Sequence, residues 1–336
     1  MAPQVRWDAT VPRFGAGTVA AEAFLDEHGF VVIRDALSAP EVATALSLVW
    51  DALELLGSGI DRADATTWTN DRWPGQGETG AGLTGVRGDY GLTHSPALWY
   101  VRGAPQVKTA FAALWGTDEL LTSFDGLALT RPFGLNPEHR PRQVFHYDRG
   151  PGPDPGRWNY LQGFVNLIPT TPATGGNVLL AGTHIKYAGL AAEYGGPDSA
   201  GPSLSGARLF ADHPELFQGT AINPHLEGGD LYLWDDRCLH CGMTPPDQPG
   251  APAAELQRAM VLVCMAPKAR AAEGYAENRR LAFAEGVGGG HAAAGTIDVA
   301  GAKQSLQESG RWDNFGTFTR VPPPAKLTAA QLALLA

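Results

Sequence analysis

The chain has 336 residues, which is enough for one large domain or two small ones around a sizeable core. Its 42 glycines and 26 prolines predict many turns and a β-rich body rather than a helical bundle. A formal net charge of −10, with only 18% charged residues, argues against a nucleic-acid partner, because no basic excess exists to bind phosphates.

The cysteines and the apolar runs indicate where the protein works. Cys238, Cys241 and Cys264 are too few for a disulfide framework, which favours a reducing compartment. The N-terminal segment lacks the apolar core of a signal peptide, and no run of about 18 apolar residues could span a membrane. We therefore expect a cytoplasmic protein whose partner is a small molecule.

The first part of the chain predicts two helices around a buried strand. Residues 19–29 have the pattern of a short helix, and residues 30–34 that of a buried strand. Ser38 and Glu41 then form a capping-box pattern, which predicts a helix that ends near Gly57.

A long segment without periodicity, residues 58–95, follows. Such a loop inside a domain is usually functional or disordered, and its Trp68, Trp73 and Tyr90 argue against disorder. The aromatic residues of 68–99 are more often part of a core than of a pocket, and Trp73 is the candidate among them for a substrate pocket. The next segment, residues 105–115, predicts another helix.

From about residue 119 the sequence predicts mainly strands separated by turns. The candidate strands are residues 121–131, 143–148, 160–167, 177–181, 230–235 and 257–265. Short helices are expected within residues 186–220, a charged helix at 268–284 and a C-terminal helix at 327–335. This pattern predicts a mainly β protein with flanking helices, in which two packed sheets form a jelly roll.

His146 and Asp148 are the first candidate metal ligands. In an extended strand, residues i and i+2 project from the same face, so both side chains can reach one point. A third ligand from a distant strand would complete two imidazoles and one carboxylate, a set that suits non-haem Fe(II). His240 follows a turn and a buried strand, which places it at the mouth of a barrel. A surface His and Asp at a strand end is the open alternative.

Arg258 begins an apolar run, so its guanidinium is expected to be partly buried and to need a carboxylate. That carboxylate is either an Asp or Glu of the chain or a dicarboxylate such as 2-oxoglutarate. Gln162 and Asn166 share one face of a strand with Phe164, which fits a cavity wall better than a solvated face. Arg131 either anchors a substrate carboxylate or pairs with an Asp.

Two further groups are interpreted as structural. His184 follows a Gly-Thr turn and precedes a probable helix, so we expect it to form hydrogen bonds rather than bind a metal. The Cys238-Leu-His-Cys241 segment lacks the second cysteine pair of a zinc site.

Several segments in order resemble the phytanoyl-CoA dioxygenase family. Residues 24–49 resemble its N-terminal signature, and residues 163–167 followed by 175–184 resemble its Gly-Gly … Pro-Gly-Ser-His segment. His240 and Arg258 are similar to its distal histidine and cosubstrate arginine. Two departures exist: Ala and Thr replace the Pro and Ser of that segment, and the gap from His240 to Arg258 is longer than usual.

The resemblance implies a double-stranded β-helix, the cupin-like jelly roll, that binds Fe(II) and uses 2-oxoglutarate and O2 as cosubstrates. The metal ligands implied in this way are His146, Asp148 and His240. Arg258 would hold the distal carboxylate of 2-oxoglutarate, and we assign Gln162 and Asn166 of the cavity wall to the same site. The substrate-pocket candidates are Arg131, Gln143 and Trp73. The expected single dioxygenase domain has a helical and loop region at 1–118, a jelly-roll core at about 119–266 and a helical extension at 267–336.

The implied reaction is hydroxylation through an Fe(IV)-oxo species, with succinate and CO2 as co-products. Asp148 argues against halogenation, because halogenases that resemble this family have Ala or Gly there; desaturation and ring closure stay open. No basic cluster suits a CoA diphosphate, so we expect a smaller substrate, amino-acid-like or a secondary metabolite. A cupin-like metalloenzyme that does not use 2-oxoglutarate and a non-catalytic jelly-roll binding protein are the alternatives.

Overall fold

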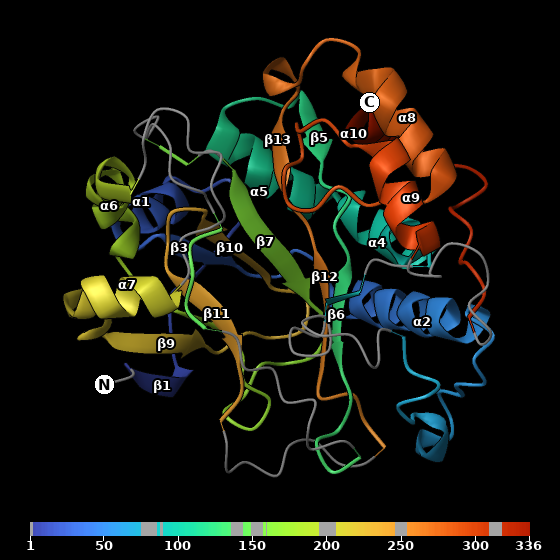
Figure 1. Cartoon of the computed structure of the whole chain (residues 1–336), viewed down its shortest axis with the longest axis horizontal. Coiled ribbons are helices and arrows are strands. Elements are labelled where there is room, and N and C mark those ends of the chain that lie inside the picture. Colours follow the sequence, from blue (N-terminus) through green and yellow to red (C-terminus); the bar gives the residue numbers. More distant parts are fainter. Residues whose placement is uncertain are drawn as a thin grey trace.

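Two β-sheets pack face to face between layers of helices in the computed structural model of the chain (Figure 1). The structure describes residues 3–74, 86–87, 90–135, 144–148, 157–158, 160–194, 206–245, 254–308 and 318–336. The space between the two sheets contains the cavity described below.

The larger sheet has the strand order β2-β3-β10-β7-β12-β6-β4, and β13 and β5 extend it beside β7. Its strands are β2 (Arg13–Phe14), β3 (Phe30–Ile33), β4 (Val86–Arg87), β5 (Leu120–Thr122), β6 (Leu127–Thr130), β7 (Leu161–Asn166), β10 (Leu231–Asp235), β12 (Arg258–Leu262) and β13 (Met265–Pro267). β7 lies between β10 and β12 and pairs with both of them in antiparallel orientation.

The smaller sheet has the order β1-β9-β8-β11. Its strands are β1 (Gln4–Ala9), β8 (Gly176–Leu179), β9 (Thr220–Pro224) and β11 (His240–Met243). β1 pairs in parallel with β9, and an isolated antiparallel bridge joins His146 to His240 at the start of β11.

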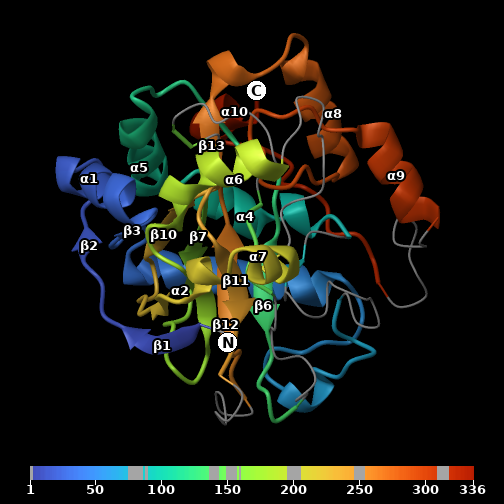
Figure 2. The ribbon, with the colours of Figure 1, turned by 60° about the vertical axis from the view of Figure 1, so that its left-hand side comes forward.

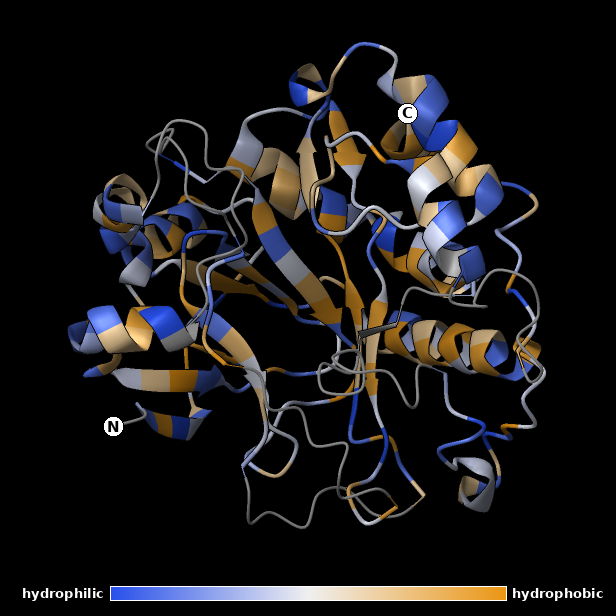
Figure 3. Ribbon diagram, viewed as in Figure 1, coloured by the Kyte–Doolittle hydropathy of each residue, from blue (hydrophilic) through white to orange (hydrophobic). Residues whose placement is uncertain are grey.

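Alternation along the strands separates the layers of the core. In β10, Leu231 and Leu233 belong to the hydrophobic cluster beneath the helices, whereas Tyr232 and Trp234 belong to the cluster between the sheets. Successive side chains of a strand point to opposite faces, so one strand serves both layers. Figure 3 shows how hydrophobic residues run along the central strands.

The helices cover the outer faces of both sheets. They are α1 (Val19–His28), α2 (Ala39–Leu55), α4 (Pro96–Arg102), α5 (Pro105–Trp115), α6 (Tyr187–Tyr194), α7 (Gly206–Asp212), α8 (Tyr275–Glu285), α9 (Val299–Glu308) and α10 (Ala329–Leu335). The 3-10 helices are η1 (Ala65–Thr67), η2 (Leu92–His94), η4 (Thr183–Lys186), η5 (Pro214–Phe217) and η6 (Lys268–Arg270). The first helices, α1, α2, α4 and α5, pack on the larger sheet, α6 and α7 cover the smaller sheet (Figure 2), and α8 to α10 surround Trp99 and Phe124.

The N-terminus of α2 confirms the predicted capping box. The Glu41 carboxylate accepts hydrogen bonds from the Ser38 backbone N–H at 2.7 Å and from the Ser38 hydroxyl at 2.6 Å. Ala45, Val49 and Leu53 then form the buried face of the helix against the sheet. Local sequence therefore sets where this helix begins and which face it buries.

The predicted elements are mostly present, with two corrections. The expected strand 121–131 is divided into β5 and β6, because Asp125 and its neighbours leave the sheet between them. Within the described part of 143–148 there is no strand, and only His146 forms a bridge. The elements that were not predicted include β1, β9, β11, α4 and α9. None of the helices in the described ranges is long and apolar enough to cross a membrane.

Candidate metal centre and its cavity

A cavity of about 320 Å³ lies between the two sheets. Its lining residues are Asp125, Ala128, His146, Asp148, Phe164, Asn177, Trp234, His240, Gly242, Arg258, Met260, Leu262 and His291. Three of them were predicted as metal ligands and one as the cosubstrate arginine. The structure thus brings side chains from distant parts of the chain into one space.

His146, Asp148 and His240 lie at metal-ligand spacing. One carboxylate oxygen of Asp148 lies 3.3 Å from His146 Nε2, and the other lies 3.3 Å from His240 Nε2. The three ligand atoms lie within 4.8 Å of one another. Ligands about 2.1 Å from one ion and at right angles would be about 3.0 Å apart, so the donor set fits one metal ion on one side.

Backbone hydrogen bonds fix both imidazoles. His146 and His240 exchange N–H···O=C bonds of 3.0 and 3.2 Å across the bridge between them. Their Nδ1 atoms donate to the carbonyls of Val144, at 2.8 Å, and Cys238, at 3.0 Å. A carbonyl only accepts, so each Nδ1 carries a proton, and each Nε2 faces Asp148. Each ring is therefore prepared to bind a metal through Nε2.

The charges of the cluster favour ionised Asp148. Burial alone would raise the pKa of Asp148, but the imidazoles of His146 and His240 hold it well below the usual carboxyl range. Burial would lower the pKa of His146, and the contact with Asp148 outweighs it and raises that pKa. A carboxylate that stays ionised between two imidazoles suits a divalent cation.

Gln162 and Asn166, expected to bind the cosubstrate, have other contacts. Gln162 Nε2 donates to Asp148 Oδ2 at 2.5 Å and so orients the carboxylate. Asn166 does not line the cavity, contrary to the expectation: its amide donates to the carbonyl of Ile168 at 2.6 Å and to those of Leu226 and Glu227. The physical reason is that this amide meets the backbone carbonyls of two neighbouring loops, of which the one of Leu226 is buried and needs a donor.

Arg258 lines the cavity with its charge uncompensated. It is 7% exposed, and among the described residues its Nη2 contacts Met260 Sδ at 3.4 Å. Its Nε is buried without a partner, and burial lowers its pKa to about 10. A guanidinium in this state is suited to an anion that enters the cavity.

The substrate-pocket candidates do not gather here. Arg131 donates to the carbonyl of Trp68 at 2.5 Å and to Asn70 at 2.8 Å, and it lies over the ring of Trp73. Both Arg131 and Trp73 are buried outside the cavity lining, so they stabilise the segment after α2 instead. Gln143 lies outside the described residues.

The interpretation of His184 as structural is confirmed. Its Nε2 donates to the carbonyl of Asp26 at 3.0 Å, and it does not line the cavity. Cys238 and Cys241 are buried free thiols. Cys238 donates to the carbonyl of Leu180.

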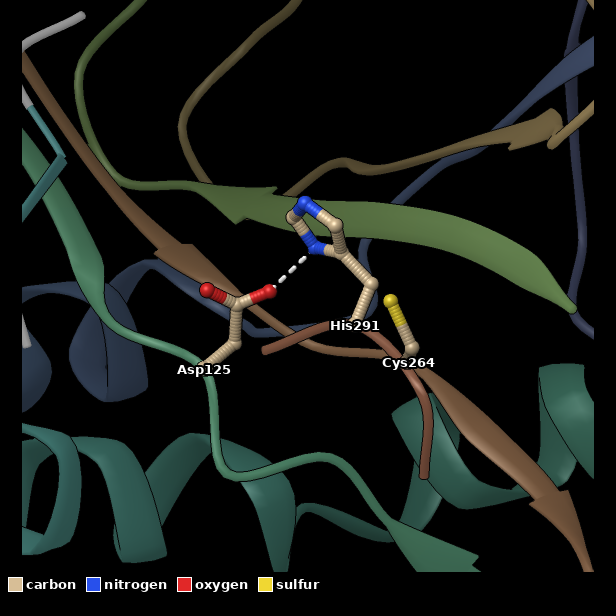
Figure 4. Close-up of side chains that lie close together, drawn as sticks. All are labelled: Asp125, Cys264 and His291. Atoms are coloured by element: carbon tan, nitrogen blue, oxygen red, sulfur yellow. Dashed lines mark ion pairs between the residues drawn. The ribbon is translucent and has the colours of Figure 1, made fainter. Parts of the chain in front are cut away.

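Sequence reasoning missed Asp125 and His291, which form an ion pair in the cavity wall (Figure 4). Asp125 interrupts what looked like one strand, and this polar break was an available signal. His291 lies in a Gly- and Ala-rich stretch that carries no periodicity.

The proteins that this chain resembles include two curated relatives and a solved structure. Ava biosynthesis cluster protein O of Aspergillus versicolor is 29% identical over 263 residues, covering 76% of this chain and 80% of that protein. A putative phytanoyl-CoA dioxygenase of Dictyostelium discoideum is 25% identical over 256 residues, covering 66% and 69%. The non-haem α-ketoglutarate-dependent carbocyclase SnoK of nogalamycin biosynthesis superposes with a TM-score of 0.50 at 16% identity, covering 74% and 84%. No family model matches the chain. The resemblance found in the sequence and the expected jelly-roll fold are confirmed.

Proposed function

We propose that this chain, a phytanoyl-CoA dioxygenase-like member of the non-haem iron, 2-oxoglutarate-dependent dioxygenases, hydroxylates a small molecule. Fe(II) would be held by His146, Asp148 and His240. Arg258 would bind the distal carboxylate of 2-oxoglutarate, and O2 would be the second cosubstrate.

The observation that carries this proposal is the position of Arg258. A buried guanidinium without a carboxylate partner among the described residues lines the same cavity as the three metal donors. Burying such a charge is costly unless an anion compensates it. A dicarboxylate that chelates the metal at one end and meets Arg258 at the other answers both requirements.

Each residue of the site has a defined task. The bound iron would activate O2 with electrons supplied by 2-oxoglutarate, which becomes succinate and CO2. Gln162 holds Asp148 in place, and the two backbone-fixed imidazoles keep their lone pairs directed at one point. The apolar side chains of the cavity wall would exclude water, and the bound substrate would be the oxidisable group nearest to the iron.

A secondary metabolite is the substrate class that we propose. The relative from Aspergillus versicolor is named for a biosynthesis cluster. Asp148 occupies a position that a halide would need, so hydroxylation is favoured over halogenation. Desaturation and ring closure use the same oxidant and differ only in how the substrate lies.

An anaerobic titration tests the proposal. Fe(II) and 2-oxoglutarate added to the full chain should produce a weak visible charge-transfer band, and admission of O2 should yield succinate. His146→Ala should abolish the band, because it removes one of three ligands. His184→Ala is the matched control, since it changes a histidine of η4 that donates to the carbonyl of Asp26 outside the cavity lining, and it should keep the band.

Two outcomes would count against this function. No iron uptake would favour a non-catalytic binding protein. Iron uptake without a 2-oxoglutarate band, with turnover unaffected by Arg258→Ala, would favour a cupin-like enzyme that does not use 2-oxoglutarate.

A further inference from the structure

Asp125 and His291 form a fixed polar pair in the cavity wall, outside the proposed metal ligands. His291 Nδ1 contacts Asp125 Oδ2, and Asp125 Oδ1 accepts the N–H of Gly126 at 2.8 Å. Both oxygens of this carboxylate are therefore engaged. Figure 4 shows the second ring nitrogen, Nε2, on the side of the imidazole that faces away from Asp125.

The backbone around the pair is held from two directions. The carbonyl of Asp125 accepts from Thr93 Oγ1 at 2.7 Å and from Arg102 Nη2 at 2.8 Å. The loop before His291 pairs with the same segment, since Gly290 bridges Phe124. The C-terminal extension thus delivers His291 to the cavity as a positioned side chain rather than as a free loop residue.

Nε2 of His291 faces the proposed metal ligands. It lies 3.9 Å from Asp148 Oδ2, which is beyond hydrogen-bond distance. The His291 side chain is 36% exposed, and it lines the cavity. Within the described ranges, no hydrogen bond engages this nitrogen, so a group in the cavity can reach it.

The surrounding charges select the kind of group that fits. An ammonium would need a free carboxylate oxygen, but those of Asp125 are engaged and those of Asp148 face His146, His240 and Gln162. A carboxylate would lie beside Asp125 and Asp148, and Arg258, the cation of this cavity, is already assigned to 2-oxoglutarate. A hydroxyl can both donate and accept, so it suits Nε2 in either protonation state of the ring.

Most of the remaining cavity wall is apolar, and Asn177 is its one uncharged polar side chain among the residues that the structure describes. The apolar residues are Ala128, Phe164, Trp234, Met260 and Leu262. Such a wall favours an apolar or aromatic body over a charged, amino-acid-like one. A substrate that met both features would carry one hydroxyl on a largely apolar frame.

We propose that His291, positioned by Asp125, binds a hydroxyl group of a largely apolar substrate beside the metal ligands. This subsite rests on the proposed function and deepens it, because it names the class of substrate. Asp125, Cys264 and His291 also have the spacing of a metal cluster. The direct contact between Asp125 and His291 leaves no room for an ion between them, which favours the ion pair.

Binding of three matched probes tests the subsite. The probes are 2-naphthylmethanol, 2-naphthylmethylamine and 2-naphthoate, which share a ring system and differ in their polar group. Saturation-transfer NMR on the full chain, with and without anaerobic Fe(II) and 2-oxoglutarate, gives their affinities. The alcohol should bind most tightly, and His291→Ala should weaken it roughly fivefold, the worth of about one hydrogen bond.

Two further variants separate binding from packing. His291→Gln should recover most of the affinity for the alcohol, because its amide can also donate and accept. Cys264→Ala, a change in the same cluster, should leave the iron content at one per chain.

The subsite is overturned if 2-naphthylmethanol does not bind saturably, binds His291→Ala equally well, or binds more weakly than the amine or the carboxylate. Two irons per chain, with one lost in Cys264→Ala, would instead show a second metal site. Alcohol binding that depends on His291 without the iron and 2-oxoglutarate band would leave the subsite standing and remove the proposed function. The iron and 2-oxoglutarate band without alcohol binding that depends on His291 would keep the proposed function and remove the subsite.

Discussion

Two buried arginines, one in the cavity and one in the C-terminal helical layer, differ in the hydrogen bonds that their guanidinium groups donate. Arg279 of α8 donates to the carbonyls of Leu335 at 2.6 Å, Ala293 at 2.7 Å and Thr122 at 2.5 Å, and lies over the ring of Phe124. Arg258 of β12 has, within the part of the chain that the structure describes, a sulfur contact at 3.4 Å and no such carbonyl acceptor. Burial lowers the pKa of each to about 10.

The difference distinguishes a structural cation from one kept for a ligand. Arg279 ties β5, α10 and the loop after α8 together, and its N–H groups are used in doing so. Burial disfavours the charge of Arg258 to a similar degree. Among the described residues, however, Arg258 does not donate to backbone carbonyls as Arg279 does. An uncompensated buried charge at a cavity is therefore the stronger sign of function.

The largest expected effect separates the two arginines by ligand affinity. Arg258→Met should weaken 2-oxoglutarate binding about 100-fold, because the distal carboxylate would lose its buried charged partner. Titration of the visible band with 2-oxoglutarate measures this change. Arg279→Met, the matched control, should leave the affinity of the folded protein unchanged, and a comparable loss in both variants would break the comparison.

The second prediction concerns stability, for which Arg279→Met should have a larger effect than Arg258→Met. Arg279→Met should lower the free energy of unfolding by about 3 kcal/mol, since several buried carbonyls would lose their donor. Arg258→Met should leave it unchanged or raise it, because an uncompensated charge is removed. Urea denaturation of the metal-free chain compares them, and a larger loss for Arg258→Met would contradict the assignment.

The smallest effect concerns the two amides of β7. Asn166→Ala should lower the free energy of unfolding by about 1 kcal/mol, because the buried carbonyl of Leu226 loses a donor, and should leave 2-oxoglutarate affinity unchanged. Gln162→Ala should instead reduce iron affinity, since Gln162 holds Asp148. Chemical denaturation and Fe(II) titration together check the pair; a weaker 2-oxoglutarate complex in Asn166→Ala would restore its cosubstrate role.

The spacing of hydrophobic residues predicted most of the helices and strands, because a helix and a strand each bury such residues at a different spacing. α2 was readable from Ser38, Glu41 and its apolar positions. β1 also carried a signal, since Val5, Trp7 and Ala9 alternate with polar residues, but it pairs in parallel with the distant β9. Such a pairing has no turn signal between its strands, so it is harder to infer.

The proposed metal ligands were predicted by order and type, and the contacts of their neighbours were not. Nothing local shows that the amide of Asn166 faces backbone carbonyls while that of Gln162 reaches Asp148, because both lie on one strand face. Likewise, His291 enters the cavity only through pairing of its loop with Phe124. Contacts set by tertiary structure leave no trace in spacing.

The bridge between His146 and His240 also has a kinetic consequence. These residues lie far apart in the chain, so the loop between them must close before their backbones can pair. A metal that requires both imidazoles would bind the assembled state and have little affinity for the unfolded chain. It would slow unfolding and leave the refolding rate almost unchanged. Iron would then stabilise the folded state kinetically, after protein contacts alone have formed it.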